Sequence, residues 1–272
     1  MVLAHVSDLH FGRIAGPRVA DALVADVEEH SPDLVVVGGD LTQRSRFREW
    51  RGVDALLSSF SSPCLVIAGN HDVYPWWFPV RRLLVPLLRY RSRGLDIRGT
   101  WSGDGVAVAA LNSAHGWTVK GGRFRRADLE LAASHFGRHP DTRLKVLLVH
   151  HQIVPSRFAS RGDVAAGSRR VLECAAAAGA DLVLDGHIHR SAVGVLEAGG
   201  RTLVHSSAGT ATSDRGRFED RGRNLYSIVR MPGSDILEIE ERVYDDADGA
   251  FTLERRTSFR RASGNWSVDP AK

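Results

Sequence analysis

The sequence predicts an α/β protein in which alternating strands and helices build a parallel sheet and an antiparallel tail follows. Two patterns predict this fold class. In the first half of the chain, short apolar runs alternate with segments of helical periodicity, whereas after His189 the hydrophobic period changes to two. Five of the apolar runs also lead, directly or after one or two Ser or Gly residues, into Asp, Asn or His. We therefore expect polar side chains to gather where strands end.

Three strands separated by two helices open the chain. The expected strands are 2–6, 34–37 and 64–68, and the expected helices are 17–29 and 47–60. In the first helix, Val19, Leu23 and Val27 recur at helical spacing, and Pro17 lies in the first turn. This βαβαβ order implies right-handed crossovers and a parallel sheet.

The stretch 74–94 is basic and leucine-rich, and it predicts a cap or rim helix that Pro86 should kink. Trp76 and Trp77 lie at the edge of its apolar stripe, a pattern typical of peripheral membrane contact through 75–94. The alternative is a stripe that packs against the core or a second subunit, and this is favoured because aliphatic stripes usually pack inside. Since the stretch 75–94 begins three residues after Asp72, we expect it to form one wall of the substrate entrance.

The rest of the chain divides into a mixed segment and a tail. A strand is expected at 106–111, helices at 127–136 and 169–178, and polar loops at 112–126 and 155–167. Four antiparallel strands should then complete a second sheet, at 193–196, 202–205, 224–230 and 236–243. The pattern fades after residue 245. We therefore expect one catalytic domain over 1–245 and a C-terminal extension over 246–272.

Composition limits the classes of protein. With 272 residues and 43% apolar content, the chain can bury one large core. No apolar run approaches the ~18 residues of a membrane span, and the first strand begins without a signal-peptide pattern, so a cytoplasmic protein is expected. The net charge of +4 favours anionic partners only mildly. The sequence predicts no oligomeric state.

The polar residues at the strand ends are a metal-binding set. They are Asp8, His10, Asp40, Asn70, His150, His187 and His189. Carboxylate, imidazole and amide oxygen together suit Mn, Fe, Zn or Co, whereas oxygens alone would suit Mg or Ca. Seven candidates are too many for one open catalytic ion. Two ions that share a bridging carboxylate account for the number.

The motifs Asp8-x-His10, Gly39-Asp40, Gly69-Asn70-His71-Asp72, His150 and Gly186-His187-x-His189 occur in this order. Together they resemble the motif set of the calcineurin-like metallophosphoesterase superfamily, with spacing most similar to its small bacterial class III cyclic-nucleotide phosphodiesterase-like branch. The resemblance implies a four-layer α/β/β/α sandwich of two mixed sheets flanked by helices. It also implies a dinuclear centre with two divalent ions, Mn or Fe first and Zn or Co as alternatives.

The resemblance assigns roles to individual residues. It gives Asp8, His10 and His189 to one ion, Asn70, His150 and His187 to the other, and Asp40 to both. His187 and His189 would point to opposite faces of a regular strand, so both reach metals only if the chain bends at Gly186. His151 competes with His150, which we retain because it directly ends an apolar run.

His71 is the expected catalytic residue. By resemblance it contacts the phosphate and protonates the leaving oxygen, for which imidazole has a suitable pKa. The structural alternative is a histidine bonded to Asp72. Four further residues in nearby loops are candidates for substrate binding, namely Arg44, His115, Arg157 and Arg161.

The function implied by these residues is hydrolysis of a phosphodiester, with a hydroxide that bridges the metals as the nucleophile. The substrate would be a small-molecule or lipid-linked phosphoester. Alternatives are a UDP-sugar-lipid pyrophosphate, as in the related lipid A precursor hydrolases, nucleic acid, as in repair nucleases, and a protein-binding scaffold without catalysis. Nucleic acid is not favoured. The continuation Leu41-Thr42-Gln43-Arg44 departs from the Asp-Arg-Gly of Ser/Thr phosphoprotein phosphatases, which argues against protein dephosphorylation.

Overall fold

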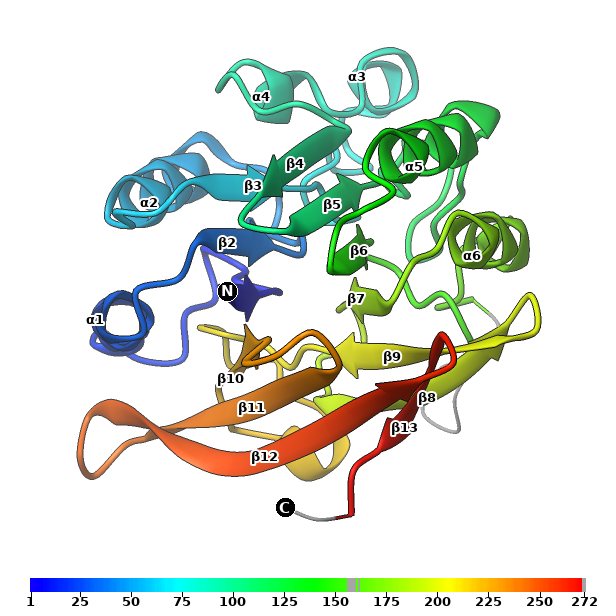
Figure 1. The fold of residues 1–272 in the computed structure, drawn as a ribbon. Coiled ribbons are helices and arrows are strands. Elements are labelled where there is room, and N and C mark those ends of the chain that lie inside the picture. Colours follow the sequence, from blue (N-terminus) through cyan, green and yellow to red (C-terminus); the bar gives the residue numbers. More distant parts are fainter. Residues whose placement is uncertain (156–159, 161, 271–272) are drawn as a thin grey trace.

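Two β-sheets packed face to face form the centre of the molecule (Figure 1). The computed structural model describes residues 1–155, 160 and 162–270. The first sheet has the order β13-β12-β11-β10-β1-β2-β3, and the second has the order β4-β5-β6-β7-β9-β8. Both sheets mix parallel and antiparallel pairs.

The strand bounds follow the apolar runs of the sequence. In the first sheet they are β1 Val2–Val6, β2 Leu34–Val37, β3 Cys64–Val66, β10 Leu225–Arg230, β11 Ile236–Asp245, β12 Ala250–Ala262 and β13 Asn265–Val268. In the second they are β4 Gly99–Gly103, β5 Val106–Ala110, β6 Leu144–Leu148, β7 Leu182–Asp185, β8 Ala192–Ala198 and β9 Arg201–Ser207.

Helices cover the outer faces of the two sheets. They are α1 Val19–Glu29, α2 Phe47–Ser58, α5 Arg126–Arg138 and α6 Ser168–Ala177, while α3 Pro79–Leu84, α4 Leu88–Arg91 and the 3₁₀ turn Phe218–Asp220 lie in loops. Within the described ranges, no helix has the length and apolar content that a bilayer crossing requires. The expected helices at 17–29, 47–60, 127–136 and 169–178 are confirmed to within a few residues.

Strands buried on both faces explain the four layers. In β2, Val35 and Val37 pack toward α1 and α2, whereas Leu34 and Val36 pack between the sheets. Successive side chains of a strand point to opposite faces, so a continuous apolar run is what a doubly covered strand requires. The expected α/β/β/α sandwich of two mixed sheets is confirmed.

The tail is distributed differently from the expectation. Only β8 and β9 join the second sheet, and β9 pairs in parallel with β7. β10 instead pairs antiparallel with β1, so the later strands extend the first sheet. The segment 246–272, expected as an extension, contributes β12 and β13 to that same sheet.

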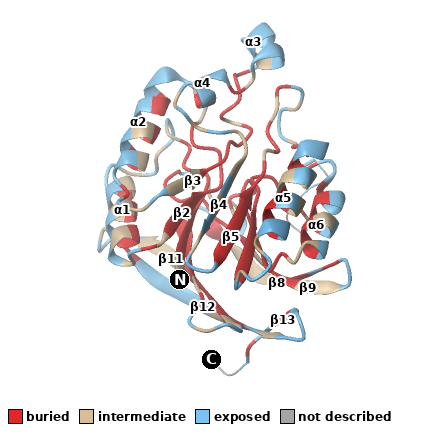
Figure 2. Cartoon of the chain, turned by 45° about the horizontal axis from the view of Figure 1, so that its top comes forward, coloured by how far each residue is buried: buried red, intermediate tan, exposed pale blue. Residues whose placement is uncertain are grey.

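The stretch 74–94 forms two short helices, α3 and α4, with Pro86 between them. Leu87 and Tyr90 are buried, but most of its apolar stripe is exposed, including Val80 and Leu84 (Figure 2). The expectation that the stripe packs against the core of its own chain was therefore wrong. Pro86 divides the stripe, and the buried Leu87 and Tyr90 both follow it.

Candidate metal centre

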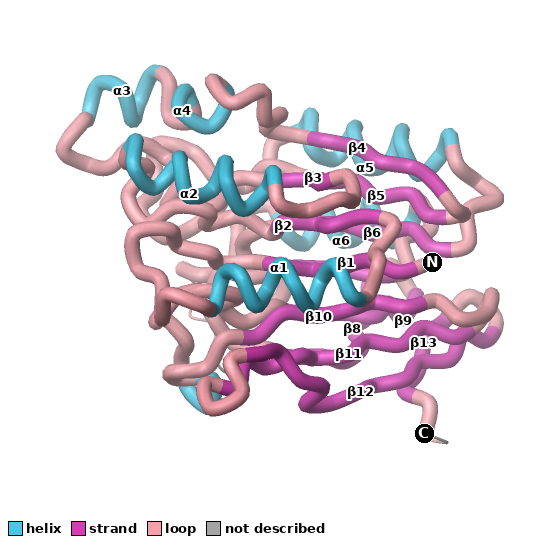
Figure 3. Tube along the Cα trace, turned by 90° about the vertical axis from the view of Figure 1, so that its left-hand side faces the viewer, coloured by secondary structure: helices cyan, strands magenta, loops and turns pink. Residues whose placement is uncertain are grey.

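The loops that follow the parallel strands gather at one end of the sandwich (Figure 3). β1, β2 and β3 run parallel in the first sheet, and β6 and β7 run parallel in the second. Their carboxyl ends therefore meet at this end of the molecule, as the sequence patterns predicted. All seven candidate metal ligands lie there, at most 9% exposed.

Several of these residues have left-handed backbone conformations. The φ angles are 55° at Asp8, 47° at His10, 51° at Asp40, 72° at His187 and 56° at His189. Side chains other than glycine rarely adopt this conformation, which costs free energy and persists where the surrounding structure enforces it. The bend expected at Gly186 is present at His187 and His189, so both histidines turn into the same region.

The first group consists of Asp8, His10, Asp40 and His189, whose candidate ligand atoms all lie within 4.8 Å of one another. Nε2 of His189 is 3.0 Å from Nε2 of His10 and 3.1 Å from Oδ1 of Asp8. The ring of His189 donates from Nδ1 to the carbonyl oxygen of Arg215, 2.8 Å away. Its Nε2 lone pair therefore faces the group.

The second group consists of His150, His151 and His187, whose candidate ligand atoms lie within 4.8 Å of one another. Asn70 is the further ligand that the sequence predicts beside His150 and His187. Nδ1 of His150 donates to the carbonyl oxygen of Gly38 at 2.7 Å, and its Nε2 lies 3.3 Å from Oδ1 of Asp40. The amide nitrogen of Asn70 donates to the carbonyl oxygen of Val119 at 3.3 Å, which turns Oδ1 of Asn70 inward. Asp40 thus stands between the groups, since its Oδ2 is 3.6 Å from Nε2 of His10.

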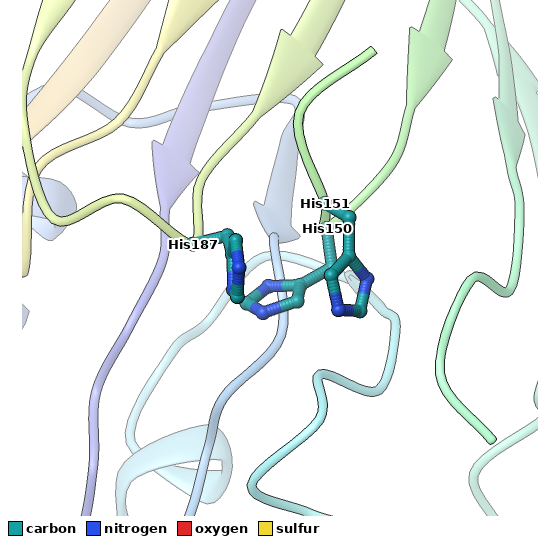
Figure 4. A group of neighbouring side chains, drawn as sticks. All are labelled: His150, His151 and His187. Carbon is teal, nitrogen blue, oxygen red and sulfur yellow. The ribbon is translucent and has the colours of Figure 1, made fainter. Parts of the chain in front are cut away.

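His151 lies beside His150 and His187, and the three rings are shown in Figure 4. Both of its ring nitrogens are engaged: Nε2 lies 2.9 Å from the carbonyl oxygen of Lys120, and Nδ1 lies 2.7 Å from Oγ of Ser113. His150, in contrast, keeps Nε2 without a hydrogen bond among the described residues. The geometry thus favours His150 over His151 as a ligand.

Four buried polar atoms make the centre suitable for cations. Oδ1 of Asp8, Oδ2 of Asp40, Oδ1 of Asn70 and Nε2 of His150 have no hydrogen-bond partner in the described part of the chain. Unpartnered buried polar atoms are costly unless a water or an ion satisfies them. Burial opposes ionisation of Asp8 and Asp40, yet His189 beside Asp8 and His150 beside Asp40 hold the pKa of both carboxyls well below their usual range. This anionic donor set fits two divalent cations.

The pKa of the histidines responds to the same carboxylates. Burial lowers the pKa of His10 to about 3, and the neighbouring Asp8 and Asp40 only partly oppose this effect. Burial would also lower the pKa of His150, but Asp40 outweighs it and raises the pKa to about 9. Metal binding at Nε2 of His150 therefore competes with a proton.

His71 lies at the edge of the centre, where Nδ1 donates to the carbonyl oxygen of Gln43 at 2.8 Å. Its Nε2 accepts from Nη1 of Arg215 at 3.1 Å. Among the described residues, no hydrogen bond joins His71 to Asp72. The carboxylate of Asp72 instead accepts from Gly69 N, Leu41 N and Thr42 N. The structural alternative for His71 therefore lacks the bond to Asp72 that it assumed, and Asp72 instead ties together the turns after β2 and β3.

A pocket of about 250 Å³ opens beside the centre. It is lined by Gln43, Arg44, Asn70, His71, Val73, Pro75, Trp76, Arg82, Val119, Lys120 and Arg215. Arg44 thus lies where a substrate would enter. His115 instead lines a separate cavity of about 200 Å³ with Leu84 and Arg125. The remaining candidates, Arg157 and Arg161, lie outside the described residues.

Two residues of the centre had no sequence motif to mark them. Arg215 follows the last histidine motif by many residues, and only its Arg- and Gly-rich loop distinguishes it. Asp163 lies 3.5 Å from Nε2 of His187 through its Oδ1, and its other oxygen accepts from Ser160 N and Oγ. Asp163 is thus the acidic neighbour of His187, whose two ring nitrogens have no hydrogen-bond partner among the described residues.

The protein combines a two-sheet sandwich with a buried cluster of Asp, Asn and His at its strand ends. This combination is typical of metal-dependent hydrolases built on an α/β/β/α core. The model of the calcineurin-like phosphoesterase family matches residues 1–191. The chain therefore belongs to the calcineurin-like phosphoesterase family.

Two curated relatives are phosphodiesterases by name. The chain is 35% identical over 98 residues to glycerophosphodiester phosphodiesterase GpdQ of Enterobacter lignolyticus, a match that covers 32% of this chain and 35% of that protein. It is 27% identical over 164 residues to a probable cyclic nucleotide phosphodiesterase of Synechococcus sp., covering 55% of this chain and 57% of that protein. The matches thus span about a third and a little over half of the relatives' lengths.

Two solved structures share the fold at low sequence identity. Purple acid phosphatase PPD1 from yellow lupin seeds has a TM-score of 0.72 and 11% identity, covering 97% of this chain and 54% of that chain. A dimetal phosphatase from Danio rerio has a TM-score of 0.66 and 13% identity, covering 93% of this chain and 98% of that chain. Both structures cover more of this chain than the family model does, since that model matches residues 1–191.

Proposed function

We propose that this protein is a metal-dependent phosphodiesterase with a dinuclear centre. One observation carries the proposal: Asp40 and three other candidate ligands, Asp8, Asn70 and His150, each keep a buried ligand atom without a hydrogen-bond partner in the described part of the chain. Family membership and the names of the two curated relatives support phosphodiester hydrolysis. Metal content without activity would instead point to the scaffold alternative.

The proposed ligand sets follow the two groups of side chains. Asp8, His10 and His189 would hold one ion, and Asn70, His150 and His187 would hold the other. Asp40, which stands between the groups, would serve both. Imidazoles among the ligands favour Mn or Fe, with Zn and Co as alternatives. When bound, such ions supply Lewis acidity toward phosphoryl oxygens and lower the pKa of a nucleophilic water.

His71 and Arg215 act at the open side of the centre. Burial lowers the pKa of His71, and the cation of Arg215 lowers it further, although Asp40 opposes both. A phosphodiester anion that takes the Arg215 guanidinium as its partner removes this influence, so the pKa of His71 rises and Nε2 holds a proton. Nε2 then donates that proton to the leaving oxygen, while Arg215 offsets charge on the phosphoryl group.

The substrate is a phosphodiester whose head group fits the pocket beside His71. A pocket of about 250 Å³ accommodates a small anion and leaves a longer substituent outside. Arg44 and Lys120 line the same pocket and complement a second negative charge. Small diesters and lipid-linked diesters both meet these requirements, whereas an extended nucleic-acid groove is not needed.

The test is hydrolysis of a panel of phosphoesters by the Mn-loaded protein. The panel contains bis-p-nitrophenyl phosphate, cyclic AMP, a glycerophosphodiester, a UDP-lipid and single-stranded DNA. We expect turnover of the diesters and loss of turnover after chelation. Activity confined to the UDP-lipid pyrophosphate or to DNA would reject the proposed substrate class. Complete inertness of a metal-loaded sample would reject the enzyme.

A further inference from the structure

The apolar side chains around α3 form an exposed face that the metal centre does not account for. The most exposed are Trp76 at 69%, Val80 at 67%, Leu84 at 76%, Trp117 at 76% and Val119 at 72%. We call these five residues, with Leu83, Val85 and Leu88, the docking face. α3 and α4 lie on the outside of the end where the strand-end loops gather (Figures 2 and 3). Contiguous exposed apolar residues of this kind mark interaction sites.

The docking face is held in place by polar contacts beneath it. Arg82 donates from Nε to the carbonyl oxygen of Gly116 at 3.0 Å, and also to the carbonyl oxygens of Tyr74 and Thr118. Gly116 approaches so closely that a Cβ there would lie 1.8 Å from the carbonyl oxygen of Arg82. The loop that carries Trp117 is therefore fixed against α3, so the two parts form one surface.

Charge around the docking face has one sign. The segments 73–95 and 112–127 contain no Asp or Glu. Their exposed cations include Arg81, Arg91, Lys120, Arg123 and Arg125. An apolar surface surrounded by cations complements a layer of anionic head groups above hydrocarbon, and tryptophan is enriched at such interfaces.

We propose that the docking face binds the surface of an anionic lipid bilayer. A second copy of this chain fits less well, because a two-fold interface would bring the arginines of both copies together without any acidic partner. Single-stranded nucleic acid stacks on aromatic rings, yet Val80, Leu83, Leu84 and Leu88 offer no ring. Moving such aliphatic side chains from water into hydrocarbon lowers their free energy, which favours a bilayer as the partner.

Binding in this orientation brings the pocket to the lipid surface. Trp76 belongs to the docking face and also lines the pocket that contains His71 and Arg215. A lipid whose head group is a phosphodiester would thus meet the centre without leaving the bilayer. This last step rests on the proposed function, whereas attachment to the bilayer does not.

The experiment is co-sedimentation of the full-length, Mn-loaded protein with vesicles. One set of vesicles contains phosphatidylcholine alone, and the other contains phosphatidylcholine with phosphatidylglycerol. We expect binding to the anionic vesicles, weakened by salt, and little binding to the neutral ones. Equal binding to both sets, or none to either, would overturn the proposal.

Two double variants assign the contacts. Arg81→Gln with Arg91→Gln should weaken partitioning about 30-fold, since each cation near an anionic surface is worth roughly a fivefold change. Leu84→Ser with Trp117→Ser should weaken it by at least about tenfold. Arg169→Gln and Leu253→Ser, at exposed positions on α6 and β12, are the matched controls. Losses in the controls equal to those in the test variants would contradict the assignment.

Two further readouts separate the alternatives. Both double variants and both controls should hydrolyse soluble bis-p-nitrophenyl phosphate like the wild type. A wild-type protein that hydrolyses no substrate but still binds vesicles would reject the proposed function and leave the proposed bilayer binding intact. Sedimentation velocity tests whether the wild type forms a dimer. If the wild type is a dimer that does not bind vesicles, and Leu84→Ser with Trp117→Ser dissociates it, the docking face belongs to a second copy. An oligonucleotide that binds where vesicles do not would assign it to nucleic acid. Either result overturns the proposal.

Discussion

Asp8 and Asp40 each divide their two carboxylate oxygens between structure and ligand binding. Oδ2 of Asp8 accepts from Ser7 Oγ at 2.7 Å and from His187 N at 3.0 Å, which leaves Oδ1 toward His189. Oδ1 of Asp40 accepts from His71 N at 2.8 Å, while Oδ2 faces His10. One oxygen thus fixes the rotamer, and the other keeps its lone pairs for a cation. Fixing the ligands in advance reduces the entropy that metal binding would otherwise cost.

The proton-donor role of His71 predicts a dependence on the leaving group. His71→Gln should keep its metal and lose about 10² to 10⁴-fold in kcat/KM on an alkyl diester, but much less on bis-p-nitrophenyl phosphate, whose leaving group needs no proton. Measuring kcat/KM on both substrates checks this. Equal losses on the two would show that His71 does not protonate the leaving group.

The contacts of the Arg215 guanidinium predict that replacing it lowers activity on anionic diesters. Arg215→Lys should keep the cation but lose the contacts that Nη1 makes to Gln43 and His71, so kcat/KM on diesters should fall by at least about tenfold. The matched control is Arg13→Lys, an exposed arginine of the neighbouring ion pair with Asp214, which should keep full activity. Unchanged activity in Arg215→Lys would remove Arg215 from the site.

The strand-end pattern was enough to predict where the seven candidate ligands lie, because all of them fall in the turns after five strands, β1, β2, β3, β6 and β7. Their metal binding stays a prediction. The positions of Arg215 and Asp163 could not be predicted in this way. Arg215 reaches His71 only after β8 and β9 have returned the chain to the centre, and Asp163 approaches His187 from a loop. Contacts of this kind depend on tertiary structure, which no local pattern encodes.

At the scale of elements, the turns after the strands decide whether the ligands converge. The turn after β3 passes so close to the turn after β2 that a Cβ on Gly69 would lie 2.1 Å from Oδ1 and 2.3 Å from the backbone nitrogen of Asp40. Only glycine permits this approach. The motif Gly69-Asn70-His71-Asp72 is therefore as much a packing requirement as a chemical one.

Gly69→Ala should consequently displace Asp40 and reduce both metal content and activity severely, because the alanine methyl group would contact backbone that cannot move aside. Metal analysis of the purified variant, with circular dichroism as a check on folding, measures this. Gly137→Ala on α5 is the control, since no atom lies within 4 Å of a Cβ at that position. A folded Gly69→Ala protein with full metal content would refute this view of the turn.

The helices and most strands could be predicted because their apolar periods are long and regular. The stretch 74–94 could not, since its stripe reads as one helix and Pro86 divides it. The direction of the stripe depends on which turn reaches the core, and after Pro86 that turn carries Leu87 and Tyr90. Hydrophobic periodicity identifies an apolar face but does not say whether the protein itself covers that face.

At the scale of the whole molecule, the C-terminal strands complete the first sheet and close the space between the sheets. Trp266 of β13 is 1% exposed and belongs to the apolar cluster between the sheets, together with Phe259 of β12. Its Nε1 donates to Oδ1 of Asp181 at 3.1 Å. Sequence patterns missed this role because the two strands carry many exposed polar residues and bury only a few side chains.

Trp266→Ala should therefore destabilise the protein by about 3–5 kcal/mol, through the loss of buried apolar surface and the cavity that remains. Urea unfolding followed by circular dichroism measures the free energy of unfolding. The neighbouring Val268→Ala, at a 51% exposed position, should cost little. A Trp266→Ala protein as stable as Val268→Ala would mean that the tail is dispensable.

The central claim is that one carboxylate, Asp40, joins two metal sites into one hydrolytic centre. The most direct measurement counts metal ions per chain and follows bis-p-nitrophenyl phosphate hydrolysis while a chelated sample is titrated with Mn. We predict that activity appears with the second equivalent and that Asp40→Asn neither binds two ions nor regains activity. Full activity in the chelated sample, or in Asp40→Asn, would contradict the claim.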